Sequence, residues 1–343
     1  MDFQIALFLV QDGLTNGAIY ALMALSLVLV FSVTRVIFIP QGELLAFGTL
    51  TLAALEMGQF PGVVWLLCVL GGTAFVFDLF TASSHARRGF LARSAGWNLA
   101  LPALVAATCW WAATRDLSFP MHVALTFACV VPLGPMLYRV AYQPIAEASV
   151  LTLLIISVAL HLALTGIGLL LFGAEGSRTP AFSSASFEIG ALLVTGQSIA
   201  VYVCSIALAA ALFIFFDRTI WGKALRATAI NRVGARLSGI SAEFAGKVSF
   251  LLAALIAVFS GLLIGPITTI YYDTGFMIGL KGFVGAIIGG LASYPIGMAG
   301  AVLVGLLEAF ASFYASAYKE VIVFTLIIPV LLWRSARSRG LEE

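Results

Sequence analysis

Long uninterrupted runs of apolar residues recur along most of this 343-residue chain. Each run holds about 18 or more residues, enough to cross roughly 30 Å of hydrocarbon as an α-helix. Polar and apolar residues do not alternate in the runs, as they would in the strands of a membrane β-barrel. We therefore predict an all-α polytopic integral membrane protein with about 10–11 transmembrane helices. The predicted spans are 9–34, 41–57, 61–82, 97–114, 121–138, 149–173, 197–216, 247–271, 276–292, 296–316 and 320–333.

The basic residues collect on one side of this map of spans. Loops rich in Lys and Arg face the cytoplasm, and the opposite side keeps only Arg115, Arg178 and Lys319, mixed with acidic residues. This distribution predicts a cytoplasmic C-terminus and, for an odd number of spans, an N-terminus on the other side. The residues assigned to the cytoplasmic side are Arg35, Arg87, Arg88, Arg93, Arg139, those of 221–247, Arg334, Arg337 and Arg339.

No linker, low-complexity tract or convincing internal repeat divides the chain, so residues 1–343 are predicted to form a single membrane domain. Several spans carry small residues at four-residue spacing, which lets helix backbones approach closely in lipid. The last third of the chain is therefore expected to be a compact bundle. The small residues with this structural role are Gly285, Gly289, Gly297 and Gly305, together with Gly261, Gly265 and Ala301.

A basic segment, about 217–247, separates two long apolar runs and is too polar to span a membrane. Leu225, Ala229, Val233 and Leu237 follow one another at spacings of four, which predicts a short helix with one apolar stripe. Lys and Arg in such a loop can serve topology alone. A plain topology loop needs no apolar stripe, so the pattern favours docking of a soluble partner.

Ionisable residues at membrane depth are costly, and they mark either a transport pathway or a buried pair. Gln41 and Glu43 follow Pro40 beside a short span, and broken helices of this kind expose backbone groups to substrate cavities. A helix-capping or packing role is the alternative for both residues. Lys281 and Glu308 lie on adjacent predicted spans, where a structural ion pair is favoured over a pathway role.

Three further polar groups have a plain and a functional interpretation. Tyr271, Tyr272 and Asp273 lie at the predicted outer interface, as part of an aromatic belt or as a rim where a substrate enters. His161 is interpreted as an interhelical hydrogen-bonding residue rather than as a proton relay. Asp78 lies near the cytoplasmic end of its span, and there an unspecialised interfacial role is favoured.

Catalytic and nucleotide-binding motifs are not found in the sequence. The three histidines are scattered, without an H-E-x-x-H or paired-carboxylate pattern. The stretch 279–282 holds Gly-Leu-Lys-Gly but lacks the upstream spacing and the following Ser or Thr of a phosphate-binding loop. We therefore expect a transport subunit rather than an enzyme, with no metal or cofactor bound by this chain. If ATP drives transport, another polypeptide must supply the nucleotide site.

Four patches, covering about two-thirds of the chain, have a familiar pattern. They are residues 13–22 followed by 41–44, then 138–145, 226–240 and 275–309. These patches resemble the permease subunits of branched-chain amino-acid ABC transporters of the LivH type. The last patch is the most specific, because Lys281, the glycine pair Gly289-Gly290 and Glu308 recur there in the family's order and spacing.

The resemblance implies an ABC importer permease fold in the bacterial inner membrane. The chain would move a hydrophobic (branched-chain) amino acid, or a similar small carboxylate or amide, from a periplasmic binding protein to the cytoplasm. The implied partners are a second permease of LivM type, two ABC ATPase subunits that hold ATP and Mg, the binding protein and membrane lipid, with no nucleic acid. The implied ATPase-coupling residues are Ala224, Arg226, Asn231, Arg232, Arg236, Leu237, Gly239 and Ile240. The substrate-pathway candidates are Tyr20, Gln41, Glu43, Tyr271, Tyr272, Asp273 and Lys281.

Two departures from the family pattern qualify these expectations. Residues of about 76–121 are interpreted as an inserted span pair, and 38–40 reads Phe-Ile-Pro where the family usually has Asn-Phe-Ala. The alternative function is a self-contained secondary transporter driven by a proton or cation gradient, with Glu43, Asp78 or Glu308 binding the ion. That alternative predicts inverted-topology repeats, and the sequence reveals none.

Overall fold

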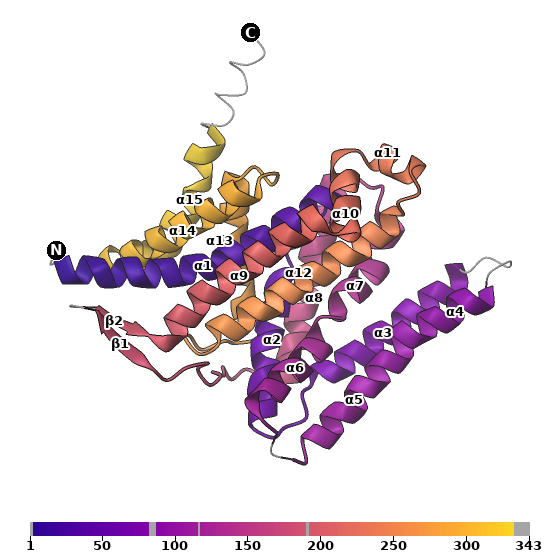
Figure 1. Cartoon of the computed structure of the whole chain (residues 1–343), viewed down its shortest axis with the longest axis horizontal. Helices are drawn as coiled ribbons and strands as arrows, with labels where there is room; N and C mark the ends of the chain where they lie inside the picture. The colour runs from indigo at the N-terminus through magenta and orange to yellow at the C-terminus, as the bar shows by residue number, and fades with distance from the viewer. Residues whose placement is uncertain (1–2, 82–86, 116, 190–191, 333–343) are drawn as a thin grey trace, which may run out of the picture.

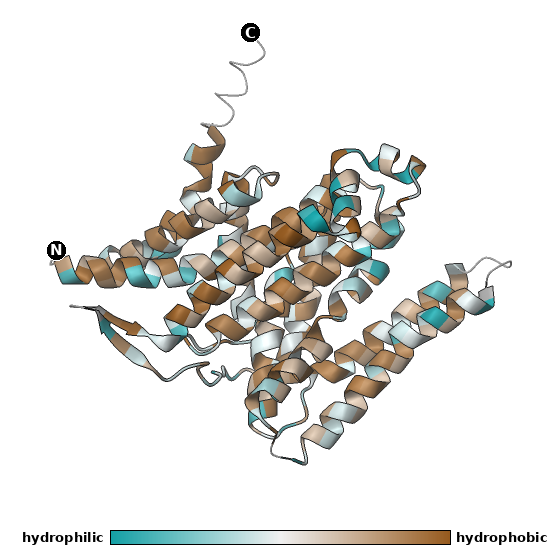
Figure 2. Ribbon diagram, viewed as in Figure 1, coloured by the Kyte–Doolittle hydropathy of each residue, from teal (hydrophilic) through white to brown (hydrophobic). Residues whose placement is uncertain are grey.

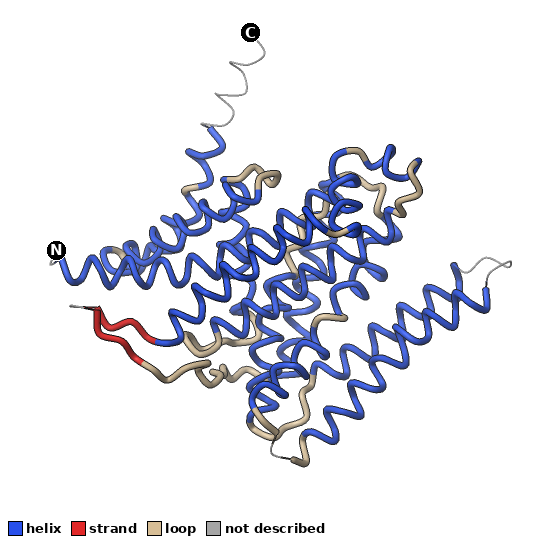
Figure 3. Tube along the Cα trace, in the orientation of Figure 1, coloured by secondary structure: helices blue, strands red, loops and turns tan. Residues whose placement is uncertain are grey.

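The computed structural model describes residues 3–81, 87–115, 117–189 and 192–332, and most of them are helical (Figures 1 and 3). The helices are α1 (Phe3–Thr34), α2 (Gln41–Glu56), α3 (Val63–Thr81), α4 (Arg87–Ala95), α5 (Leu101–Ala112), α6 (Phe119–Val130), α7 (Leu133–Leu137), α8 (Val150–Phe172), α9 (Gly196–Arg218), α10 (Ile220–Ile230), α11 (Arg232–Leu237), α12 (Ala242–Ile264), α13 (Thr274–Ile288), α14 (Tyr294–Tyr314) and α15 (Lys319–Thr325). Short π-helical turns are η1 (Gly96–Ala100) and η2 (Tyr138–Tyr142), and 3-10 turns are η3 (Gln143–Ile145) and η4 (Ser316–Tyr318).

Every apolar run found in the sequence coincides with a helical segment. Within the described residues, 7 helices are long and apolar enough to cross a membrane. They begin at Phe3, Val63, Phe119, Val150, Gly196, Ala242 and Tyr294. The other four predicted spans fall on α2, on the composite α4–η1–α5, on α13 and on the region that begins with α15, where the helices are shorter or interrupted. Most of the ribbon is coloured as hydrophobic, and hydrophilic residues gather near α10 and α11 (Figure 2).

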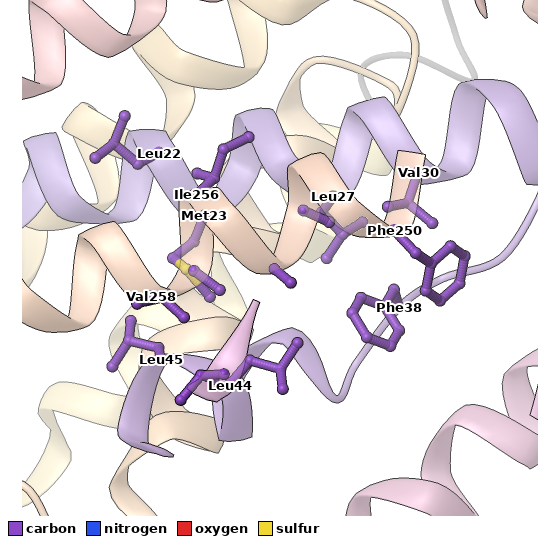
Figure 4. Close-up of a cluster of buried hydrophobic side chains, with 14 of the residues drawn as sticks. Leu22, Met23, Leu27, Val30, Phe38, Leu44, Leu45, Phe250, Ile256 and Val258 are labelled. Atoms are coloured by element: carbon purple, nitrogen blue, oxygen red, sulfur yellow. The ribbon is translucent and has the colours of Figure 1, made fainter. Parts of the chain in front are cut away.

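The centre of the bundle is formed by α1, α2, α12, α13 and α14. The second half of α1 is apolar on every face and is surrounded by the other helices, as a helix with no polar stripe must be. Figure 4 shows side chains from α1, α2 and α12 meeting in one cluster. Phe38, in the link between α1 and α2, packs on Phe250 of α12 with ring centroids 4.6 Å apart. This packing fixes the α1–α2 break inside the core.

Small residues allow the central helices to touch. A Cβ atom on Gly305 of α14 would fall on the backbone of Gly17 in α1, and one on Gly285 of α13 would fall on Ala301 of α14. The backbones of Gly289 and Gly297 meet in the same way. The hydrophobic effect does not drive helix association in lipid, so close van der Waals packing of this kind holds the helices together instead.

A helical hairpin formed by α3 and α4–η1–α5 projects from one side of the bundle (Figure 1). Its two arms touch closely, because Gly71 has no side chain where the carbonyl oxygen of Asn98 passes. The predicted insertion at about 76–121 contains the end of α3, all of α4–η1–α5 and the first residues of α6. The range is therefore not two whole helices, and its status as an insertion stays a prediction.

Two short strands depart from the all-helical expectation. β1 (Ser186–Ile189) pairs antiparallel with β2 (Leu192–Thr195), with Ser186 opposite Thr195. The side-chain amide of Gln11 on α1 donates to the carbonyl oxygen of Leu193, 3.2 Å away. The hairpin thus lies beside the first turns of α1, at the end of the molecule away from α10 and α11 (Figure 1).

Candidate functional site

The coupling segment, defined as residues 217–247, folds into two short helices instead of one. Thr219 caps α10 by accepting a hydrogen bond from the Gly222 amide. Asn231 ends α10 in an extended conformation, and its Oδ1 accepts from the Gly234 amide at 2.9 Å to begin α11. The prediction of a single helix is therefore wrong, because the helix is interrupted at Asn231. The side chain of Asn231 hydrogen-bonds to a nearby backbone amide and so competes with a continuous helical backbone.

The break also divides the predicted apolar stripe. Leu225 is fully buried under α10, whereas Val233 is 68% and Leu237 85% exposed on α11. Ile230, the last residue of α10, is 80% exposed and extends this apolar surface. We call Ile230, Val233 and Leu237 the docking patch. Large apolar side chains exposed together on a polar segment mark an interaction site.

Contacts with the link between η3 and α8 hold α11 in place. Arg232 donates to the carbonyl oxygen of Ala146 at 3.3 Å, and Arg236 pairs with Glu147 at 3.2 Å. Gly239 then ends the helix with a φ of 84°, the left-handed conformation that glycine favours. The Ile240 amide donates back to the carbonyl oxygen of Ala235. Of the other coupling candidates, Ala224 is half-buried and Arg226 is exposed on α10.

Gln41 and Glu43 are completely buried at the start of α2. Gln41 accepts a hydrogen bond from Ser26 at 2.9 Å and donates to the Met23 carbonyl oxygen at 3.1 Å. Glu43 Oε1 lies 2.6 Å from Nδ1 of His161 on α8. The geometry therefore brings His161 into the interhelical hydrogen bond expected of it. The pathway role of Gln41 and Glu43 stays a prediction.

Lys281 of α13 lies at the centre of a second polar cluster. Its Nζ donates to Glu308 Oε1 on α14 at 2.6 Å and to Glu320 Oε1 on α15 at 3.2 Å. The Tyr20 hydroxyl on α1 donates to the other oxygen of Glu308 at 2.7 Å. The cluster around the nearly buried ammonium group of Lys281 thus joins four helices. Charged groups inside a membrane are expected to be paired in this way. Glu320 is a partner that the sequence reasoning did not include.

Tyr271, Tyr272 and Asp273 form the turn before α13. Tyr271 and Asp273 are exposed and Tyr272 is half-buried. The 23-residue helix α12, which starts at the coupling segment, rises about 33 Å before it reaches this turn. The turn therefore lies at the opposite end of the bundle from α10 and α11, as both interpretations of these residues require.

The Asp78–Arg139 pair was missed at the sequence level. The charge distribution predicts Arg139 in a cytoplasmic loop, but this residue is buried in η2 with its Nε 2.6 Å from Asp78 Oδ1. Ser94 and Asn98 also donate to Asp78. Asp78 is thus buried and paired, and it anchors the projecting hairpin to the bundle. This is a structural role, and the position of Asp78 at the membrane interface stays a prediction. Partners 61 residues apart give no local sequence signal.

A second missed pair joins α2 to α6, where Glu56 Oε1 lies 2.6 Å from His122 Nδ1. The expectations on Arg334, Arg337, Arg339 and the C-terminus lie outside the described residues. The cytoplasmic position of the C-terminus stays a prediction.

Comparison with known proteins identifies the family. The family described as "Branched-chain amino acid transport system / permease component" matches residues 9–331. The permease protein LivH of the high-affinity branched-chain amino acid transport system of Escherichia coli (strain K12) is 27% identical over 347 residues, covering 97% of this chain and 95% of the relative. LivH of Salmonella typhimurium has the same identity and coverage over 346 residues.

The permease protein BraD of Pseudomonas aeruginosa is 28% identical over 237 residues, covering 66% of this chain and 77% of the relative. No solved structure matches the chain significantly. The family match extends over the central bundle, the polar clusters and the coupling segment alike. The chain belongs to the family of permease components of branched-chain amino acid transport systems, and it is a multi-pass transport subunit of an ABC system rather than an enzyme.

Proposed function

We propose that the chain carries a hydrophobic (branched-chain) amino acid, or a similar small carboxylate or amide, across the bacterial inner membrane. The substrate arrives from a periplasmic binding protein and leaves to the cytoplasm. A second permease of LivM type and two ATPase subunits, which hold ATP and Mg, complete the importer. The printed names of the relatives, which are permease proteins of high-affinity branched-chain amino acid transport systems, support this substrate class.

The docking patch is the observation that carries this proposal. Ile230, Val233 and Leu237 expose apolar surface on a segment that the charge distribution assigns to the cytoplasm. Water-exposed apolar side chains of this size are stabilised when a partner covers them. The adjacent Arg236 supplies charge at the rim of the patch. A soluble ATPase subunit is the partner that an ABC permease needs at this side.

Movement at the docking patch has two routes into the bundle. α11 contacts the link after η3 through Arg232 and Arg236, and residues 238–241 join it to α12. α12 packs on α1 and α2 in the central core (Figure 4). Closure of the ATPase pair can therefore shift the equilibrium between two arrangements of the bundle, one open to the outside and one open to the cytoplasm. Alternating access requires such a shift.

We place the Glu43–His161 pair on the substrate route that opens during this cycle. Glu43 Oε2 is buried without a hydrogen-bond partner, and an unsatisfied buried oxygen costs about 1–3 kcal/mol. His161 stacks on Phe276 of α13 with ring centroids 4.0 Å apart, so a shift of α13 changes the surroundings of the pair. An intramembrane carboxylate with a spare oxygen is suited to bind an ammonium group.

Co-purification tests the proposed coupling. The chain is co-expressed with the second permease and the ATPase subunits, and the ATPase recovered on the tagged chain is measured in mild detergent. Val233→Ser with Leu237→Ser is expected to reduce recovery at least tenfold, because the apolar contact is lost. Phe90→Ser, which removes another exposed apolar side chain on the predicted cytoplasmic side, is the matched control.

Equal ATPase recovery from the double variant and the control would contradict the docking patch. A chain that purifies without ATPase subunits, yet drives uptake from an ion gradient in liposomes, would contradict the importer and support the secondary transporter.

A further inference from the structure

A cavity of about 580 Å³ lies against the coupling segment and belongs to neither polar cluster. It is bounded by the end of α1, by α9 and α10, and by the turn that leads into α14. Along α1 the lining runs from Leu25 to Arg35, about 15 Å of helix. The volume lies within the range of about 300–1,000 Å³ that is typical of small-molecule sites.

The lining separates into a polar end and an apolar remainder. Arg35 and Arg226 bring two guanidinium groups to the cavity, and Ser32 and Tyr294 add two hydroxyls that lie 3.4 Å from one another. Every other lining residue is apolar, and the lining contains no carboxylate. The side chain of Arg226 makes no hydrogen bond or ion pair with the described residues. The cavity is therefore amphipathic and carries uncompensated positive charge.

Backbone strain concentrates at the same cavity. Among the described residues, only two that are not glycine have a positive φ, and they are Arg35 at 64° and Leu291 at 56°. Both line this cavity. Arg35 closes the C-terminus of α1, where its amide donates to the Phe31 carbonyl oxygen, and glycine is the residue favoured at such an end. Strain retained at two positions of one cavity points to a functional constraint there.

We propose that this cavity binds an anionic phospholipid from the leaflet on the coupling-segment side. The phosphate lies between the guanidinium groups of Arg35 and Arg226, because arginine matches phosphate oxygens with two donors at once. The acyl chains follow the apolar wall formed by Leu212, Phe213 and Phe216 of α9 and enter the bilayer beside Phe213, which is 70% exposed. Basic pockets between transmembrane helices on the cytoplasmic side bind anionic headgroups in this way.

A soluble phosphate fits the cavity less well than a lipid. Its hydration is lost against a wall that is apolar outside the polar end. The lipid also contacts α10 and the core helices α1 and α14 together, since Leu225 and Arg226 of α10, Leu25 of α1 and Met298 of α14 all line the cavity. The inference concerns binding alone, so it does not depend on which substrate the permease carries.

Lipid retention tests the proposal on the full chain. The purified protein is equilibrated in detergent with equimolar phosphatidylglycerol and phosphatidylcholine, and bound lipids are counted by native mass spectrometry. We expect one phosphatidylglycerol to be retained preferentially, and Arg35→Gln with Arg226→Gln to reduce its retention at least tenfold. Arg88→Gln with Arg93→Gln removes two exposed arginines of α4 that do not line the cavity, and should leave retention unchanged.

Two further variants separate lipid loss from misfolding. Arg35→Gly suits the left-handed backbone, so it should fold at least as well as the parent chain and still lose phosphatidylglycerol. Ala209→Trp fills the apolar end while both arginines remain, and should also expel the lipid. Unchanged retention in Arg35→Gly and the double glutamine variant, or equal retention of both lipids by the parent chain, would overturn the proposal. Displacement of phosphatidylglycerol by millimolar glycerol 3-phosphate would overturn it in favour of a soluble phosphate site.

Discussion

Lys281 and Glu308 lie on consecutive helices, α13 and α14, with Nζ and Oε1 2.6 Å apart. Both side chains are nearly buried, and the Tyr20 hydroxyl completes the coordination of the carboxylate from α1. Breaking such a pair leaves a buried charge without compensation, which costs more than the intact pair contributes. The pair on α13 and α14 is thus linked to α1 through the hydrogen bond from Tyr20.

Replacing Lys281 alone should destabilise the bundle strongly. Lys281→Met leaves Glu308 buried with only Tyr20 as a partner, at an expected cost of about 3–5 kcal/mol. The free energy of unfolding in mixed detergent and denaturant measures this loss. Lys319→Met is the control, because Lys319 is half-buried and makes no ion pair within the described residues.

The double variant Lys281→Met with Glu308→Met should recover part of that loss, because only the more exposed Glu320 then lacks its partner. If the double variant were as unstable as the single one, the cluster would not act as a charge pair.

Two neighbouring glycines of α3 should respond in opposite directions to alanine. Gly71→Ala places a methyl group against the backbone of Asn98 and should destabilise the projecting hairpin by about 2 kcal/mol. Gly72→Ala meets no atom within 4 Å, and should gain up to about 1 kcal/mol from helix propensity. Unfolding free energies measured side by side check both values. Equal effects of the two substitutions would mean that α3 and η1 do not pack as described.

The break at Asn231 should be sensitive to the loss of its side-chain oxygen. Asn231→Ala removes the cap on the Gly234 amide and should cost α11 about 1 kcal/mol. Hydrogen exchange at Gly234 and Ala235 should then accelerate about fivefold. Asn231→Asp retains the acceptor and should exchange like the parent chain, and fast exchange in that variant would refute the capping role.

Asp78→Ala should leave the buried Arg139 without its partner and cost about 3–5 kcal/mol of unfolding free energy. Asp217→Ala removes the exposed partner of Arg218 and should cost at most about 1 kcal/mol. Thermal unfolding of both variants in the same detergent gives the comparison. Similar values for the two would show that Arg139 does not depend on Asp78.

Hydropathy predicts the helical fold because a segment that crosses the hydrocarbon layer must be helical, long enough and apolar. These properties depend only on the residues within each apolar run, so the local sequence is sufficient to predict a helix such as Val150–Phe172. The proximity of Lys281 and Glu308 was also accessible, because adjacent spans connected by a short turn pack together.

Other features depend on contacts that local sequence does not encode. Asp78 meets Arg139, and Glu56 meets His122, only after distant helices have packed. The periodicity of 225–237 predicted one helix, because hydrophobic spacing carries no information about the capping competition at Asn231. The amphipathic cavity combines α1, α9, α10 and α14, so no single sequence pattern describes it.

ATP-driven uptake tests the central claim most directly. The chain, the proposed second permease and the proposed ATPase subunits are reconstituted in proteoliposomes with ATP inside, and the proposed binding protein delivers radiolabelled branched-chain amino acids from outside. We predict uptake that requires ATP and falls at least tenfold when Val233 and Leu237 are replaced by serine, whereas Phe90→Ser preserves it. Uptake that persists without ATPase subunits, driven by an imposed proton or cation gradient, would contradict the account.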